Sequence, residues 1–155
     1  MDNINVIRDG FNISEFKISD INGGMHDPID RSGDKFTCLV FVNPDKNGAE
    51  LINKLENNLP DTASGFKIGL SAIVPIKLKL AKRFKDDEGL GDNLYCDRDL
   101  RVGKQFSIID SSQAQPSYHP FVFVIGNDGS VRYKQAFEPS GFDMEQFRSA
   151  VSELI

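Results

Sequence analysis

Seven consecutive residues, 36–42, form an almost unbroken apolar run with the sequence Phe-Thr-Cys-Leu-Val-Phe-Val. The polar segment 31–34 precedes this run, and Asn43-Pro44 follows it. A half-exposed strand alternates apolar and polar side chains, whereas an unbroken run between turn formers is typical of a strand covered on both faces. The sequence therefore predicts a central strand in a sheet with helices on both sides, which is an α/β arrangement.

The segments around this strand predict a hairpin before it and a helix after it. Residues 16–21 alternate with period two and lead into Asn-Gly-Gly at 22–24, which predicts an N-terminal β-hairpin. After the central strand, we expect an amphipathic helix with Asp45 or Asn47 as its N-cap and Pro60 as its end. Its predicted inward-facing residues are Leu51, Ile52, Leu55 and Leu59.

The second half continues the alternation of strands and helices. Residues 66–73 predict a strand, and Pro75 lies in the first turn of a helix that ends at Gly89. Residues 93–96 predict a short strand, after which Asp97 can cap another helix. The predicted inward-facing residues are Ile76, Leu80, Ala81 and Phe84 in the first helix, and Leu100, Gly103 and Phe106 in the second.

A strong hairpin signal and a final helix complete the pattern. The apolar run 121–125, the turn Gly-Asn-Asp-Gly at 126–129 and the strand 130–134 predict an antiparallel hairpin that follows a loop through Pro116. Met144, Phe147, Val151 and Leu154 recur three or four residues apart, as on the buried face of a helix. The predicted sheet is therefore mixed, with parallel strands and an antiparallel hairpin.

Composition narrows the class of protein. A chain of 155 residues with 39% hydrophobic and 26% charged residues suits one globular domain, and we expect that domain to span 1–155. A net charge of −5 argues against nucleic-acid binding, which needs a basic surplus to neutralise phosphates. No signal-peptide pattern and no apolar stretch of membrane-spanning length occurs, so a cytoplasmic protein without membrane contact is expected.

Four segments resemble the redoxin family that includes the peroxiredoxins, also called AhpC/TSA proteins. Residues 16–24 are similar to its N-terminal hairpin, 35–42 to its central strand, 97–106 to its "D-x-D-x-x-V-A-K-x-Y" motif, and 123–133 to "F-x-I-D-x-x-G-x-V-R-Y". The resemblance extends from residue 16 to about residue 150. It implies a thioredoxin-like fold: a mixed central sheet, helices on both faces and an N-terminal β-hairpin.

The chemical motifs of that family are missing from this sequence. The Cys-x-x-Cys of thioredoxin-like reductases would fall near Lys46 and Ala49. If Glu50 matches the Glu that often follows the attacking cysteine of peroxiredoxins, that cysteine would fall at Asn47. The family's Arg before the penultimate strand would fall near Pro120, which resembles instead the cis-proline of thioredoxins. The resemblance thus implies a redoxin whose active-site thiol is absent.

Neither cysteine of the chain is an obvious substitute. Cys38 lies in the middle of the apolar strand, where burial raises the pKa of a thiol and blocks access. Cys96 lies near a predicted strand end before Asp97 and is the weak candidate for a reactive thiol, although a nearby carboxylate disfavours the thiolate. Their strands are not predicted to be neighbours, so two free thiols are expected, as in a reducing compartment.

The predicted site is a groove at the degenerate active site. Its candidate residues are Asn43, Pro44, Asp45, Lys46, Asn47, Gly48, His119 and Pro120. We expect this groove to serve a non-catalytic role in protein binding, chaperoning or assembly, with a protein or peptide partner. The alternative is a thiol-dependent peroxidase or disulfide oxidoreductase that works through Cys96 or a partner's thiol. The fold resemblance also allows a homodimer.

No metal or other cofactor is predicted. His26 has no neighbour at ligand spacing, and the segment 45–48, which faintly resembles a calcium loop, would place Lys54 where the bidentate Glu belongs.

One helix carries a dense run of charge. Five cations precede three anions: Lys77, Lys79, Lys82, Arg83 and Lys85, then Asp86, Asp87 and Glu88. This pattern favours a solvated helix whose charges compensate one another, and its alternative is a docking face for an acidic protein partner.

Overall fold

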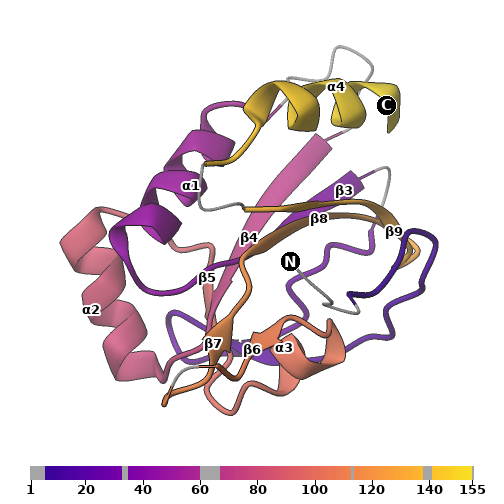
Figure 1. Cartoon of the computed structure of the whole chain (residues 1–155). Coiled ribbons are helices and arrows are strands. Elements are labelled where there is room, and N and C mark those ends of the chain that lie inside the picture. The colour runs from indigo at the N-terminus through magenta and orange to yellow at the C-terminus, as the bar shows by residue number, and fades with distance from the viewer. Residues whose placement is uncertain (1–5, 33–34, 60–66, 113, 138–140, 155) are drawn as a thin grey trace.

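The computed structural model describes residues 6–32, 35–59, 67–112, 114–137 and 141–154 (Figure 1). The main sheet contains β1 (Ile18–Asp20), β2 (Met25–His26), β3 (Lys35–Phe41), β4 (Lys67–Val74), β5 (Leu94–Cys96), β8 (Phe121–Gly126) and β9 (Val131–Ala136). A second, two-stranded sheet pairs β6 (Ile109–Asp110) with β7 (Ser117–Tyr118). The helices are α1 (Lys46–Glu56), α2 (Leu78–Glu88), α3 (Arg101–Gln105) and α4 (Met144–Leu154).

The seven-stranded sheet is mixed and has the order β2-β1-β5-β4-β3-β8-β9. β3 runs parallel to β4, and β4 runs parallel to β5, so α1 and α2 form the crossover connections. β8 and β9 are antiparallel and extend the sheet on the other side of β3, while β1 and β2 form the N-terminal hairpin. The predicted mixed sheet, the central position of residues 36–41 and the N-terminal hairpin are confirmed.

Helices cover both faces of this sheet. One hydrophobic core joins Cys38 and Val40 of β3 to buried residues of α1, α2 and α4, and the other joins Leu39 and Phe41 to Val102 of α3. Alternate side chains of β3 therefore enter opposite cores, which explains why its sequence is apolar at nearly every position. Figure 1 shows α1, α2 and α4 on one side of the sheet and α3 on the other.

Most predicted elements are confirmed, with shifts at their ends. Asp45 is the N-cap of α1, and Gly89 ends α2 in the left-handed conformation with φ of 65°. The predictions for Pro60 and Phe66 lie outside the described residues.

Two predictions about α2 are wrong. The helix begins at Leu78, so Pro75 and the predicted inward-facing residue Ile76 both lie before it, outside its first turn. Leu80 is 40% exposed, because the inward face of this short helix is filled by Ala81 and Phe84. The strands β6 and β7 were not predicted, since elements of two residues carry no periodic signal.

Candidate functional site

The junction between β3 and α1 is a tight turn held by its own polar groups. Beyond β3, the backbone N–H of Val42 still donates to the carbonyl of Ile73 at 3.1 Å. The N–H of Asp45 then donates to the carbonyl of Asn43 at 2.8 Å, and the Asp45 carboxylate accepts from the N–H of Gly48 at 2.7 Å. Asp45 thus places a fixed negative charge at the N-terminus of α1, where the helix dipole favours an anion.

Asn43 ties this junction to the chain before β8. Its side-chain Nδ2 donates to the carbonyl of Tyr118 at 3.0 Å, and its Oδ1 accepts from the N–H of Tyr118 at 2.8 Å. This pair of bonds mimics one rung of a β-ladder between residues 75 positions apart. As a result, His119 and Pro120 lie beside the start of α1, as the sequence predicted.

A buried carboxylate fixes Tyr118 from the other side. Asp97, 2% exposed, accepts hydrogen bonds from the N–H of Val102 at 3.0 Å and of Gly103 at 2.8 Å. It also accepts from the hydroxyl of Tyr118 at 2.6 Å. Burial, followed by the charge of Asp97, raises the pKa of Tyr118 well above its ordinary value, so Tyr118 stays a hydrogen-bond donor.

Asp97 therefore caps α3, but not as the predicted N-cap residue. The helix begins four residues later, at Arg101, with Leu100 at the N-cap position in the left-handed conformation. The Asp97 carboxylate reaches over this turn to the amides of the first helical residues. Of the predicted inward-facing residues, Gly103 and Phe106 are buried.

Two adjoining cavities lie at the junction and share Asn43, Asp45 and Pro120, and together we call them the junction groove. The first, of about 410 Å³, is lined by Asn43, Asp45, Asn47, Gly48, Glu50, Leu51, Lys54, Pro120, Phe137, Gly141 and Phe142. The second, of about 600 Å³, is lined by Asn43, Asp45, Asp110, Ala114, Gln115, Ser117, Tyr118, His119 and Pro120.

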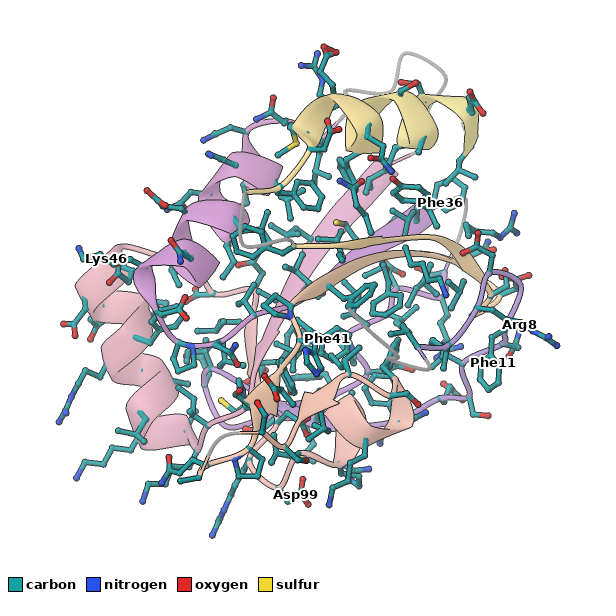
Figure 2. The ribbon with its side chains drawn as sticks, viewed as in Figure 1. Arg8, Phe11, Phe36, Phe41, Lys46 and Asp99 are labelled. Atoms are coloured by element: carbon teal, nitrogen blue, oxygen red, sulfur yellow. The ribbon has the colours of Figure 1, made fainter. Side chains whose placement is uncertain are left out.

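Six of the eight predicted groove residues line these cavities, and two do not. Pro44 and Lys46 belong to neither lining, and both are exposed. Figure 2 shows Lys46 at the outer margin of the molecule and Phe41 in its interior. Glu50, Phe137 and Phe142 were not predicted to line the groove. Of these three, only Glu50 could have been found from helical spacing, because it lies three residues after the predicted groove residue Asn47.

The junction groove carries more negative than positive groups. Asp45, Glu50 and Asp110 face it, together with Lys54 and the imidazole of His119. The hydroxyl of Ser112 donates to Asp110 at 2.6 Å and is the main cause of a lowered pKa for that carboxyl. Asp110 is therefore ionised at neutral pH, with His119 Nε2 at 3.9 Å from its carboxylate.

The expected cis-proline is not found. No cis peptide bond occurs among the described residues, and the His119–Pro120 bond is trans. The N–H of His119 donates to the carbonyl of Ile108 at 2.7 Å, and the carbonyl of Pro120 accepts from the N–H of Phe137 at 3.0 Å. Both hydrogen bonds are made with the His119–Pro120 peptide in the trans form. The resemblance of Pro120 to the cis-proline of thioredoxins is therefore wrong.

The two cysteines lie outside the junction groove. Cys38 is fully buried in β3, and burial raises the pKa of its thiol. Cys96 is 5% exposed, and burial followed by the charge of Asp20 raises its pKa to about 11, partly opposed by Lys82. Both thiols are free, and β4 lies between their strands, as the sequence predicted.

The described residues contain neither a cluster of metal-ligating side chains nor a membrane-spanning helix. His26 Nε2 lies 2.9 Å from the carboxylate of Asp20 within the β1–β2 hairpin. In the described parts of the chain, no three His, Cys, Asp or Glu side chains cluster closely enough to hold a metal ion. Within the same residues, no helix combines the length and apolar character needed to cross a bilayer.

Similarity to known proteins is found in structure and not in sequence. No protein-family model and no curated protein matches the chain. A peroxiredoxin-like protein from Aquifex aeolicus is 17% identical, with a TM-score of 0.74 over 97% of this chain and 89% of the other. PrxQ from Xylella fastidiosa is 12% identical, with a TM-score of 0.71 over 99% of both chains. Peroxidoxin BcpB from Mycobacterium tuberculosis is 13% identical, with a TM-score of 0.70 over 96% of this chain and 99% of the other.

These likenesses agree with the sheet order and with the helices on both faces, so the predicted resemblance is confirmed as a likeness of fold. The chain has the thioredoxin-like fold of the peroxiredoxins.

Proposed function

We propose that this chain is a thiol-independent binding module, which holds a peptide segment of a protein partner in the junction groove for chaperoning or assembly. The observation that carries this proposal is the hydrogen bond from the N–H of Gly48 to the carboxylate of Asp45. Free amides at a helix N-terminus stabilise a reactive thiolate in the thioredoxin fold. Here a fixed carboxylate takes one of these amides, and the first turn, from Lys46 to Ala49, contains no cysteine.

The walls of the groove suggest the chemistry of its ligand. Leu51, Phe137 and Phe142 supply apolar surface beside the polar rim. The carboxylates of Asp45, Glu50 and Asp110 outnumber the single lysine, Lys54, so a cationic ligand is favoured electrostatically. A groove with these apolar and acidic walls suits an extended peptide that carries an apolar side chain next to a lysine or an arginine.

Charge selectivity tests this proposal. A fluorescent peptide with a central phenylalanine flanked by lysines is expected to bind more tightly than the same peptide with glutamates. Replacing Glu50, whose exposed carboxylate faces the groove, with alanine should weaken the lysine peptide by roughly fivefold, measured by fluorescence anisotropy.

Glu153→Ala, an exposed carboxylate near the end of α4, is the matched control and should leave binding unchanged. Equal affinity for both peptides, together with no effect of Glu50→Ala, would contradict the proposed ligand chemistry. Backbone amide shifts of Gly48 and His119 on titration would locate a bound peptide in the groove.

A second candidate is a thiol-dependent peroxidase or disulfide oxidoreductase that works through Cys96 or a partner's thiol. It is favoured by the peroxiredoxin fold and by Lys82, whose charge lowers the pKa of Cys96 against the larger effect of burial. A pKa of about 11 leaves roughly one Cys96 thiol in a thousand ionised at pH 8, which is unsuited to attack on a peroxide.

Peroxide consumption and alkylation separate the two functions. With dithiothreitol as reductant, we expect no hydrogen peroxide turnover above the background rate. Iodoacetamide should modify native Cys96 slowly, with a rate that rises about tenfold per pH unit up to pH 11, and should modify both cysteines rapidly in urea. Peroxide turnover that Cys96→Ser abolishes would establish the second function instead.

A further inference from the structure

Two prolines remove main-chain donors from the segment that leads into β8. Pro116 and Pro120 have no N–H group, and the carbonyl of Pro120 already accepts from the N–H of Phe137 at 3.0 Å. A peptide that adds to the edge of a strand bonds to the N–H and C=O groups of every second residue of that strand. Neither proline can supply such a pair to a ligand.

Between the prolines, only one residue turns both of its main-chain groups toward the junction groove. Successive residues of a strand direct their N–H and C=O groups to opposite edges. The N–H of His119 donates to the carbonyl of Ile108 at 2.7 Å, and Ser117 pairs with Asp110 of β6, so these two residues belong to the ladder of the second sheet. Within residues 116–120, Tyr118 is thus the one that presents an N–H and a C=O to the wall of the groove.

Asn43 occupies this position. Its carboxamide donates to the carbonyl of Tyr118 at 3.0 Å and accepts from the N–H of Tyr118 at 2.8 Å. A side-chain carboxamide carries the same donor and acceptor as a peptide unit, so it stands in for a strand that could otherwise pair with Tyr118. Asn43 also lines both cavities of the junction groove, so its side chain lies between a bound ligand and this main chain.

We propose that Asn43 determines how the junction groove recognises its ligand: it closes the strand-pairing position at Tyr118, so that a peptide is bound through its side chains and not through its main chain. This inference rests on the proposed peptide-binding function. A peptide that displaced the carboxamide would exchange two hydrogen bonds for two others, with no net gain. The ligand is therefore a sequence-selective peptide, chosen by the apolar and acidic walls of the groove, and not any extended chain.

Removing the carboxamide should open Tyr118 to main-chain pairing. Asn43→Ala leaves the N–H and the C=O of Tyr118 without their partner in a part-buried site, which favours a ligand that satisfies them. Asn43→Asp is the more conservative change. Its carboxylate can still accept from the N–H of Tyr118 but cannot donate to the carbonyl, so the carbonyl alone becomes open to a peptide N–H.

An amide-to-ester scan of the lysine peptide tests the inference by fluorescence anisotropy. Each ester replaces one peptide N–H with oxygen and so removes one main-chain donor. With the wild-type chain, every ester analogue is expected to bind within about twofold of the parent peptide, because no main-chain hydrogen bond is lost. With Asn43→Ala and with Asn43→Asp, at least one analogue should bind roughly tenfold more weakly than the parent, which corresponds to one hydrogen bond.

The ratio of ester to parent affinity separates this role from a structural one. The two affinities are compared within one protein, so a general loosening of the groove weakens both peptides and leaves their ratio unchanged. Asn53→Ala, an exposed asparagine of α1 that lines neither cavity, is the matched control and should show the wild-type ratios.

Two results would overturn the inference and leave the proposed function standing. One is a roughly tenfold loss for an ester analogue with the wild-type chain, and the other is a set of ratios near one with both Asn43 variants. If the lysine peptide does not bind the wild-type chain at all, the proposed function itself fails, and the inference fails with it.

Discussion

Replacing Asp97 with alanine is expected to lower the free energy of unfolding by about 4 kcal/mol. The substitution removes the acceptor of three buried hydrogen bonds, from the N–H groups of Val102 and Gly103 and the hydroxyl of Tyr118. Bonds to a charged acceptor are stronger than neutral ones, and donors left unpaired in the interior carry a desolvation penalty. Urea denaturation followed by circular dichroism measures the change.

Two further variants test whether the loss of stability comes from the three buried hydrogen bonds of Asp97. Asp99→Ala, in the same turn, removes an exposed carboxylate that accepts from the N–H of Arg101 at 3.2 Å, and should cost less than about 1 kcal/mol. Figure 2 shows Asp99 at the surface. Tyr118→Phe removes one of the three bonds and should cost about 1.5 kcal/mol. Equal losses for Asp97→Ala and Asp99→Ala would show that the buried carboxylate does not stabilise the fold.

The Asp97→Ala substitution should also affect the junction groove. Tyr118 is bonded through its hydroxyl to Asp97 and through its backbone to Asn43, so the carboxylate supports the wall that carries His119 and Pro120. Asp97 itself does not line the groove, so Asp97→Ala is expected to weaken peptide binding by loosening this wall.

The parts of the fold that were predicted are those with strong local patterns. β3 was predicted because six of the seven consecutive residues 36–42 are apolar, and the β8–β9 hairpin because a Gly-Asn-Asp-Gly turn separates two strand-like runs. α4 was found because Met144, Phe147 and Val151 repeat at helical spacing. In each element, the local pattern and the final packing agree, so sequence reasoning needed no knowledge of distant partners.

The parts that were missed depend on contacts between distant residues. Nothing near Asn43 in the sequence indicates that its amide binds the backbone of Tyr118, 75 positions away. The trans peptide between His119 and Pro120 lies in a segment that is hydrogen-bonded to Ile108 and Phe137, which belong to other parts of the chain. The apolar walls of the groove at Phe137 and Phe142 likewise come from the chain between β9 and α4. Local patterns carry no information about such pairings.

Replacing Gly48 with alanine is expected to lower the free energy of unfolding by about 3 kcal/mol, despite the higher helix propensity of alanine. A Cβ at this position would collide with the backbone oxygen of Asn43 and would approach Cβ of Val42 to 3.0 Å. Backbone cannot rotate aside as a flexible side chain can, so the turn from Asn43 to Asp45 has to shift. The capping bond to Asp45 and the shape of the junction groove should change with it.

Gly69→Ala is the matched control, because a Cβ there meets nothing within 4 Å. Gly69 lies in β4, where alanine restricts the unfolded chain more than glycine does, so this variant should gain about 0.5 kcal/mol. The two identical substitutions are thus expected to act in opposite directions in the same denaturation experiment. If Gly48→Ala is as stable as the wild type and binds the lysine peptide equally well, the turn before α1 can relax, and its tight geometry is not what shapes the groove.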